Sequence, residues 1–459
     1  MLFALFAVNF IHNWPHHLIT NSIFIASGDT TGYYTPIESF VNGTGYGSFC
    51  RMPGLLPIYG PLYFLFGNDW GKTLLIIVQF LVSAMSVYFL AKSALLIFKS
   101  KPVFYVTFFL YALSSFVSIW DHYGLSDSFS TSFLVFSFYF FVSYFTNARP
   151  ASLVFSGIFI TWSVFIRPIN GMLIACMLLI FLIQNKNGLK QFIKGAFLFT
   201  IPCIIAISLW TLNNYTTYKR FIPLQGSFSE CYGQALTEDH LAVRELIIAW
   251  GGDFQEWSVN TEAEWFFSKK GNYRTKNPFS GKTFTSGYNL DSLIWLKMNY
   301  DSIHTGIEMD QNKKNEIKNR MIASTGRFVD SYRTERPFSF YFFNRLKFLK
   351  RFVFPAQLDD LPFPAFSKMQ LYHKVIKIGY LALLNFVSLA GILGIFVSLF
   401  RKNFYGIIPL AIIIFVAVIL GFVEQRYLVP AYPFLCIYCA FFILLVTNKF
   451  SRRKTLPLQ

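Results

Sequence analysis

The stretch TLLIIVQFLVSAMSVYFLAKSALLIF, residues 73–98, decides the fold class. Lys92 is its only charged residue, and it exceeds the about 20 residues that a helix needs to cross the roughly 30 Å core of a bilayer. Across the whole sequence 54% of residues are hydrophobic and 14% are charged, against about 25% charged in an ordinary soluble domain. The sequence therefore predicts an all-α polytopic membrane protein.

About ten membrane helices are expected along the chain. The other apolar runs are Met1 to about Trp14, then 103–120, 129–145, 151–166, 169–183, 192–212, 371–400, 407–423 and 428–446. The first run is short and has no basic start, so it does not resemble a cleavable signal peptide. It is either a helix that continues through His16 and His17 or the tail of a helix that begins upstream.

Three regions follow from this layout. Residues 1–214 form an N-terminal membrane module whose first outer loop, 15–70, is rich in Gly, Tyr, Pro and Asn and is expected to consist of turns. Residues 215–370 hold 21 basic and 17 acidic residues with aromatics throughout, as in a folded soluble domain of mixed structure. Residues 371–459 supply the last helices and a tail.

The net charge of +17 indicates orientation rather than a nucleic-acid partner. One set of alternate loops carries only basic residues: Lys99, Lys101, Arg149, Lys186, Lys190, Lys194, Arg401, Lys402, Lys449, Arg452, Arg453 and Lys454. All acidic residues outside 215–370 fall on the other side: Asp29, Glu38, Asp69, Asp121, Asp127 and Glu424. Both termini and the basic loops are therefore expected in the cytoplasm, and residues 215–370 outside.

Residues 335–355, ERPFSFYFFNRLKFLKRFVFP, mix aromatic and basic side chains. The pattern favours an amphipathic segment lying on the membrane, with an ordinary surface helix as the alternative. Cys50 and Cys231 both fall on the outer side, where they could form a disulfide, and the sequence does not decide whether they do. Cys436 and Cys439 form a CxxC within an apolar run, where cysteine usually acts as a small hydrophobe.

Ionisable residues at membrane helix ends are functional candidates, because their charge is costly there unless it is paired or solvated. On the outer side such residues are Asp29, Arg51, Asp121, His122, Asp127, Arg167, Arg220, Glu424 and Arg426. A carboxylate can accept the proton of an attacking hydroxyl, while arginines hold a phosphate and stabilise the charge that develops as it leaves. This combination suits group transfer from a lipid-linked phosphate donor.

Each of these residues also has an ordinary structural interpretation. Asp29 lies in the turn-like SGDTTG, and Asp127 has the surroundings of a helix N-cap. Arg167 precedes Pro168 at a helix end, where it could extend to the interface. Glu424 and Arg426 could pair with each other. Their shared location on one face favours a common site.

The chain resembles a bacterial member of the membrane glycosyltransferases of the C superfamily, which includes protein O-mannosyltransferases and the aminoarabinose transferase that modifies lipid A. The similar segments are GDTTGYYTPIESFVNGTGYG with RMPG, LSDSFSTSFLVF, FIRPINGML, LWTLNNYTTYKRFIPL and EQRYLVPAYPFL. The resemblance implies that Asp29 is the catalytic acidic residue. It also implies that Asp127 binds a metal or the substrate head. Arg167 and Arg426 would contact the donor phosphate, and Tyr427, the next residue after Arg426, is a further candidate for substrate binding.

Two departures from the family pattern limit what the resemblance transfers. Thr30 follows Asp29, so the paired acids of protein mannosyltransferases are absent, which leaves metal dependence open. Asn213 stands where the family often has Arg, and Arg220 is the candidate substitute. A divalent metal, Mg or Mn, would be held by Asp29 and Asp127 if it is used at all.

The sequence and the resemblance together predict an inverting integral membrane glycosyltransferase of the bacterial plasma membrane, active on the exterior face. The expected donor is a polyprenyl-monophosphate sugar, and the acceptor is a lipid, a glycan or a protein. One alternative is a glycan polymerase or ligase that uses a lipid-diphosphate donor. The other is a lipid or sugar transporter, but the sequence lacks the paired broken helices in two halves that are typical of transporters.

Overall fold

The structure is a computed structural model that describes residues 23–454, except 186–187, 227–230, 232–236, 255–260, 269–278, 280, 305–308, 356–368 and 422. The side chains of 448–454 are also outside the description. The expected first helix, Met1 to about Trp14 with its extension through His16 and His17, therefore lies outside the described residues.

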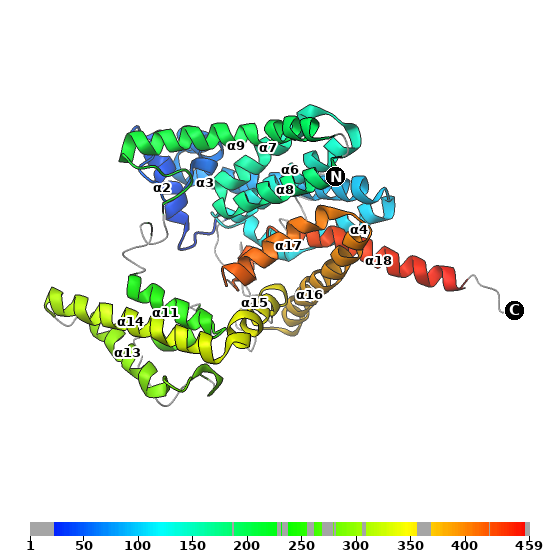
Figure 1. The fold of residues 1–459 in the computed structure, drawn as a ribbon. Helices are drawn as coiled ribbons and strands as arrows, with labels where there is room; N and C mark the ends of the chain where they lie inside the picture. The colour runs from blue at the N-terminus through cyan, green and yellow to red at the C-terminus, as the bar shows by residue number, and fades with distance from the viewer. Residues whose placement is uncertain are drawn as a thin grey trace. The chain divides into compact units, whose positions relative to one another are not determined.

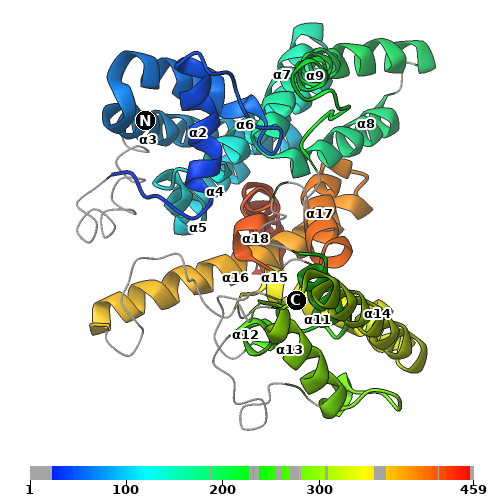
Figure 2. The ribbon, with the colours of Figure 1, turned by 90° about the vertical axis from the view of Figure 1, so that its left-hand side faces the viewer.

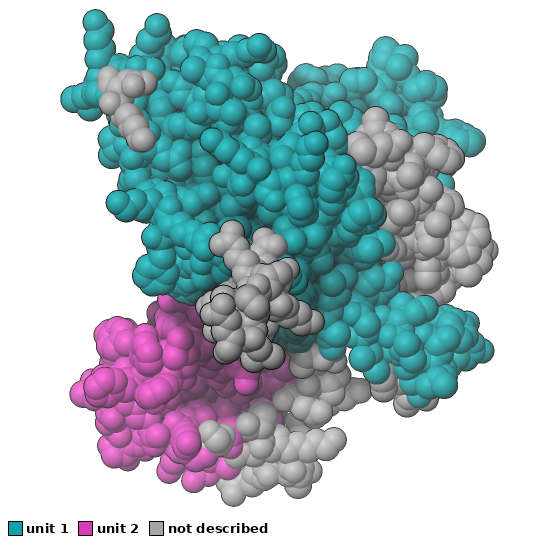
Figure 3. Space-filling view, turned by 90° about the vertical axis from the view of Figure 1, so that its right-hand side faces the viewer, with its two compact units in different colours: residues 1–226, 353–413, 425–459 teal, residues 227–352, 414–424 magenta. Residues whose placement is uncertain are grey.

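The chain divides into two compact units (Figure 3). The first comprises residues 1–226, 353–413 and 425–459, and the second comprises 227–352 and 414–424. The second unit thus takes in most of the long polar region, together with a short apolar segment from the C-terminal part of the chain.

Helices build the first unit throughout its described part (Figure 1). They are α2 (Thr30–Val41), α3 (Leu56–Phe98), α4 (Lys101–Ala112), α5 (Ser115–Ser118), α6 (Asp127–Asn147), α7 (Pro150–Ile166), α8 (Met172–Gln184), α9 (Leu189–Tyr218), α16 (Leu371–Phe400), α17 (Ile407–Ile413) and α18 (Tyr432–Lys454). Short 3₁₀ turns connect them: η1 (Pro53–Leu55), η2 (Ile119–Asp121), η3 (Pro168–Gly171), η7 (Phe404–Gly406) and η9 (Gln425–Leu428). Helix α18 packs against α16 and α4, so this late helix belongs to the same bundle as the early helix α4 (Figure 2).

The second unit is also helical where it is described. Its elements are α11 (Glu238–Ala249), α12 (Glu262–Phe267), η4 (Gly281–Thr283), α13 (Leu290–His304), α14 (Gln311–Glu335), the π turn η5 (Ser339–Phe343), α15 (Asn344–Val353) and the π segment η8 (Ile414–Ile419). Buried residues of α11, α13 and α14, among them Leu246, Leu293 and Phe328, form its core.

Among the described residues, four helices are long and apolar enough to cross a membrane: Pro53–Phe98, Asp127–Asn147, Leu189–Tyr218 and Leu371–Phe400. A fifth is obtained if the pair Lys101–Ala112 and Ser115–Asp121, bent by 47°, is one span. The remaining expected spans correspond to shorter apolar helices: Pro150–Ile166, Pro168–Gln184, Phe404–Ile419 and Tyr432–Thr447. The all-α membrane fold is therefore confirmed.

The expectation that residues 15–70 consist of turns is wrong for two stretches. Residues 30–41 form α2, because Tyr34 and Ile37 fall on one face and enter a buried cluster with Tyr59 of α3. Residues 56–66 are helical as well, since Pro57 stands in the first turn, where its missing N–H costs little. Gly67, with φ of 73°, then breaks the helix.

The cysteines have distinct states. Cys50 and Cys231 are disulfide-bonded, whereas Cys176, Cys203, Cys436 and Cys439 are free. Cys436 and Cys439 are both buried, in keeping with a packing role for the CxxC.

Candidate active site

A short backbone pairing brings the start of the described chain to the start of α6. Ile25 N–H donates to the His122 carbonyl at 3.0 Å, and Gly124 N–H donates to the Ile25 carbonyl at 3.0 Å, which makes a single parallel bridge between Ile25 and Tyr123. The His122 ring also bonds the Ile23 carbonyl through Nδ1, at 2.9 Å. The segment that leads into α2 is thereby fixed beside the segment that leads into α6.

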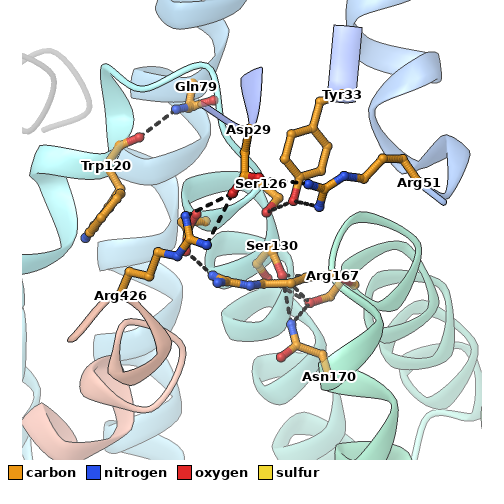
Figure 4. A network of polar contacts seen from close by, with 12 residues as sticks. Asp29, Tyr33, Arg51, Gln79, Trp120, Ser126, Ser130, Arg167, Asn170 and Arg426 are labelled. Carbon is orange, nitrogen blue, oxygen red and sulfur yellow. Dashed lines mark hydrogen bonds and ion pairs between the residues drawn. The ribbon is translucent and has the colours of Figure 1, made fainter. Parts of the chain in front are cut away.

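Asp29 immediately precedes α2 but does not cap it. Its carboxylate makes no capping hydrogen bond, and the Thr30 hydroxyl instead accepts from the Ser27 N–H at 2.8 Å. Asp29 Oδ1 lies 3.0 Å from Arg51 Nη2, while Oδ2 lies 3.3 and 3.2 Å from the Nη1 and Nη2 atoms of Arg426 (Figure 4). The turn residue of the sequence is thus held between two guanidinium groups.

Arg51 reaches Asp29 from the segment before η1. Its Nη1 donates to the Tyr33 hydroxyl at 2.9 Å, and its guanidinium carbon lies 4.2 Å from the centre of the Tyr33 ring. The Tyr33 hydroxyl is also 3.0 Å from the Oγ atom of Ser126, the residue that immediately precedes α6 (Figure 4). A chain of contacts therefore runs from Asp29 through Arg51 and Tyr33 to the residue that precedes Asp127.

The Arg51 segment is held by a close approach of backbones. The Trp162 Nε1–H donates to the Gly54 carbonyl at 2.8 Å. A Cβ at Gly54 would overlap the backbone of Phe165 and Ile166, at the end of α7. Only glycine fits there without a shift of the chain, so Gly54 fixes the RMPG segment, which carries Arg51, against α7.

Asp127 and Arg167 form a buried ion pair. Asp127 is the first residue of α6 and its side chain is 2% exposed; Arg167 lies between α7 and η3 with its side chain 9% exposed. Burial disfavours the charged guanidinium, yet the Asp127 carboxylate and Tyr427 raise the net pKa of Arg167 above its ordinary value. Arg167 therefore does not extend to the interface but remains charged inside the protein.

The buried side-chain amide of Asn170 holds the backbone next to Arg167. Asn170 Nδ2 donates to Ser130 Oγ and to Ser163 Oγ, each at 2.8 Å (Figure 4). These hydrogen bonds connect η3 to α6 and α7 and so hold the backbone beside Arg167 in place.

Tyr427 links the arginines of the two pairs. Its ring centre lies 4.8 Å from the guanidinium carbon of Arg167 and 5.4 Å from that of Arg426. Asp29, Arg51, Asp127, Arg167, Arg426 and Tyr427 thus form one continuous cluster of three cations and two anions, hereafter the arginine cluster. It has a net positive charge and can accept a phosphate group.

Two further residues were assigned to substrate binding from the sequence. Arg220 is exposed, with its guanidinium carbon 5.8 Å from the centre of the Phe49 ring. Glu424 is half-buried and belongs to the second unit. Their part in substrate binding stays a prediction.

Sequence reasoning missed Tyr33, Ser126 and Asn170. All three lie inside quoted motifs, within a few residues of a charged candidate. Their signal in the sequence is this closeness to a charged candidate, which many other Ser, Tyr and Asn residues share. What the sequence does not contain is which of the many Ser and Tyr residues face inward.

The described residues show no group of three or more His, Cys, Asp and Glu side chains that could hold a metal ion. Asp29 and Asp127, the two carboxylates named for such a role, are each paired with arginine. Two carboxylates already neutralised by guanidinium groups do not make a donor set that fits Mg²⁺ or Mn²⁺ in this arrangement.

Two comparisons, one of sequence and one of fold, relate the helical first unit to known glycosyltransferases of membranes. Residues 60–210 match the family model described as dolichyl-phosphate-mannose-protein mannosyltransferase. This match covers about a third of the chain and agrees with the resemblance to membrane glycosyltransferases found in the sequence, whereas the bacterial source stays a prediction. Among curated proteins, no sequence matches the chain.

Two solved structures carry the likeness of fold. The oligosaccharyltransferase of Archaeoglobus fulgidus in its apo form shares 14% identity, with a TM-score of 0.50 over 99% of this chain and 51% of that one. The same protein in complex with Zn and sulfate shares 13% identity, with a TM-score of 0.50 over 98% of this chain and 50% of that one. The chain therefore spans about half the length of the solved structures it matches.

Proposed function

We propose that this protein is an integral membrane glycosyltransferase. It transfers a sugar, a hexose or a pentose, from a polyprenyl-monophosphate donor to a hydroxyl or amine of a lipid, glycan or protein acceptor. The observation that carries the proposal is Asp29, a part-exposed carboxylate held between Arg51 and Arg426. A general base beside two cations suits glycosyl transfer from a phosphate, since the base takes the proton of the acceptor and the cations stabilise the leaving phosphate.

The proposed reaction is a single displacement at the anomeric carbon. The donor phosphate binds Arg51 and Arg426, which weakens their hold on Asp29 and leaves its carboxylate able to accept a proton. The acceptor oxygen or nitrogen then attacks the anomeric carbon from the face opposite the phosphate and loses its proton to Asp29. The bond from the anomeric carbon to the phosphate oxygen breaks with its electrons on the phosphate, so the anomeric centre inverts.

The remaining members of the arginine cluster position these groups. Arg167 adds a third cation for the leaving phosphate, and Asp127 keeps it charged and oriented through their buried pair. Tyr427 contacts Arg167 and Arg426 and so fixes the spacing between the two guanidinium groups.

We further propose that the site faces the exterior of a bacterial plasma membrane, with both termini in the cytoplasm. The support is the separation of basic loops from acidic ones in the sequence. The second unit would then present the acceptor on the outer side.

A donor panel tests the proposal. Purified protein in vesicles receives labelled polyprenyl-monophosphate and polyprenyl-diphosphate sugars together with candidate lipid, glycan and peptide acceptors. Label in an acceptor, from a monophosphate donor and with inverted anomeric configuration, is the expected result. Transfer only from diphosphate donors would contradict the donor assignment, and movement of the donor across the vesicle without any new glycosidic bond would contradict the enzyme assignment.

A further inference from the structure

We propose that the surface formed by Phe338, η5 and the first seven residues of α15, residues 338–350, binds the headgroup region of an anionic lipid bilayer. This inference does not depend on the proposed glycosyl transfer, because it rests on side chains of the second unit that the arginine cluster does not include.

One face of this segment is committed to the second unit. Phe348 and Phe352 are fully buried. Asn344 Nδ2 donates to the Ala249 carbonyl of α11 at 2.7 Å, and Arg351 pairs with Asp253. The helix is therefore fixed along one side, and its opposite side has a defined outward direction.

The outward side is apolar and aromatic. Its exposed large side chains are Phe338, Tyr341, Phe342, Phe343 and Leu346. Phe338 is 76% exposed and Phe342 is 55% exposed, and Leu346 continues the same row at a spacing of four residues. Five exposed large apolar side chains, hereafter the apolar strip, fall within nine residues, in contrast to the scattered exposed hydrophobics that need no explanation.

The charges around the strip favour lipid over a protein partner. Between Pro337 and Pro355 the sequence holds four basic residues and no acidic one. Arg351 pairs with Asp253, and Lys347 and Lys350 are exposed beside the apolar strip. Aromatic residues beside lysines are typical of segments that lie in the interface of anionic membranes.

A membrane protein needs only a modest surface of this kind. The apolar helices of the first unit hold the chain in the bilayer, so the lipid surface is present at a high effective concentration without any further binding step. A strip too small to recruit a soluble protein can then still be occupied by lipid.

Spin labels on the full-length protein test the surface. Single variants Phe338→Cys, Phe342→Cys and Leu346→Cys are labelled and reconstituted into phosphatidylcholine vesicles with or without phosphatidylglycerol. Met298→Cys on α13, an exposed apolar position outside the strip, is the matched control. The unsubstituted protein, labelled in parallel, gives the background from its four free cysteines.

The readout is the collision of each label with oxygen, which concentrates in lipid, and with a water-soluble nickel chelate. We expect the three strip labels to shift to the lipid side of the scale, with oxygen collisions exceeding nickel collisions, while the label at 298 stays on the water side. Water-side values at all three strip positions would overturn the proposal. Low collision with both reagents and dipolar broadening between labels would instead identify contact with a second copy of the chain, and would overturn it as well.

The lysines supply a second arm. Lys347→Glu with Lys350→Glu should move the three labels toward the water side in vesicles that contain phosphatidylglycerol and have little effect in pure phosphatidylcholine. An equal shift in both lipids would contradict the electrostatic part of the proposal.

Discussion

Asp29 and Arg426 are 397 positions apart in sequence, yet one carboxylate oxygen of Asp29 lies within 3.3 Å of both terminal guanidinium nitrogens of Arg426. This contact joins the segment before the first described helix to the turn η9 before α18. The environment of the proposed catalytic base therefore depends on a contact between two distant parts of the first unit.

Arg426→Gln should lower kcat/KM for donor by about 10²–10³-fold, the effect of removing one donor to a developing anion. Arg426→Lys should recover only part of this loss, because an ammonium keeps the charge but not the two-nitrogen contact. Steady-state kinetics at varied donor concentration measure both. Arg320→Gln is the matched control, since Arg320 is exposed and pairs with Glu316 of its own helix. Wild-type kinetics for Arg426→Gln would remove this residue from the site.

Asp127→Ala should destabilise the protein by about 3–5 kcal/mol, because it leaves the Arg167 guanidinium buried without its counterion. The double variant Asp127→Ala with Arg167→Ala should regain part of that stability while remaining inactive. Thermal unfolding in detergent, followed by circular dichroism, compares the two. If the double variant were no more stable than Asp127→Ala alone, the two side chains would not act as a pair.

Tyr33→Phe should cost about 1 kcal/mol of stability and reduce turnover, because it removes the hydroxyl that joins Arg51 to Ser126. Tyr34→Phe is its control in the same helix. Within the part of the chain that the structure describes, the buried Tyr34 hydroxyl has no hydrogen-bond partner. Unfolding and turnover measured for both variants should separate them, and equal losses would assign the effect of Tyr33 to its ring.

Gly54→Ala should destabilise by about 1–3 kcal/mol and lower activity, since a Cβ there meets the backbone of Phe165 and Ile166 and pushes the Arg51 segment away from α7. Gly28→Ala, one residue from Asp29, should be close to neutral because nothing lies within 4 Å of an added Cβ. The melting temperatures and donor kinetics of the two variants check this. A neutral Gly54→Ala would mean that the loop adjusts without affecting Arg51.

Chelation tests how the leaving phosphate is neutralised. The arginine cluster provides three guanidinium groups, and its two carboxylates are engaged by them. We therefore expect transfer to persist in the presence of EDTA. Loss of activity on chelation, restored by Mg²⁺ or Mn²⁺, would show that a metal enters this site and displaces the arginine pairs.

The class of fold could be predicted from the sequence because apolar runs such as 73–98 have a single physical explanation. The expected boundaries failed at α2, where Gly, Tyr and Pro composition indicated turns. The composition of 15–70 averages a turn-rich part, 42–52, with a helical part whose Tyr34 and Ile37 pack into a core that the sequence does not display.

For the site, the sequence identified the charged residues but not their partners. It offered Glu424 as a partner of Arg426 but did not indicate the pairing of Arg426 with Asp29. It offered Arg167 as an interfacial residue, whereas Arg167 is buried against Asp127. Charge type and membrane side are local properties of the chain, while pairing depends on contacts as distant as 397 positions, which need the folded structure.

Asp29→Asn tests the central claim most directly. The variant keeps the size and the hydrogen-bonding oxygen of the side chain but cannot accept a proton. We therefore predict that turnover falls by about 10²–10⁴-fold. Donor binding and thermal unfolding, measured on the same preparation, should show that the variant is folded and still binds the donor. Wild-type turnover of Asp29→Asn with the same donor and acceptor would contradict the assignment of Asp29 as the base.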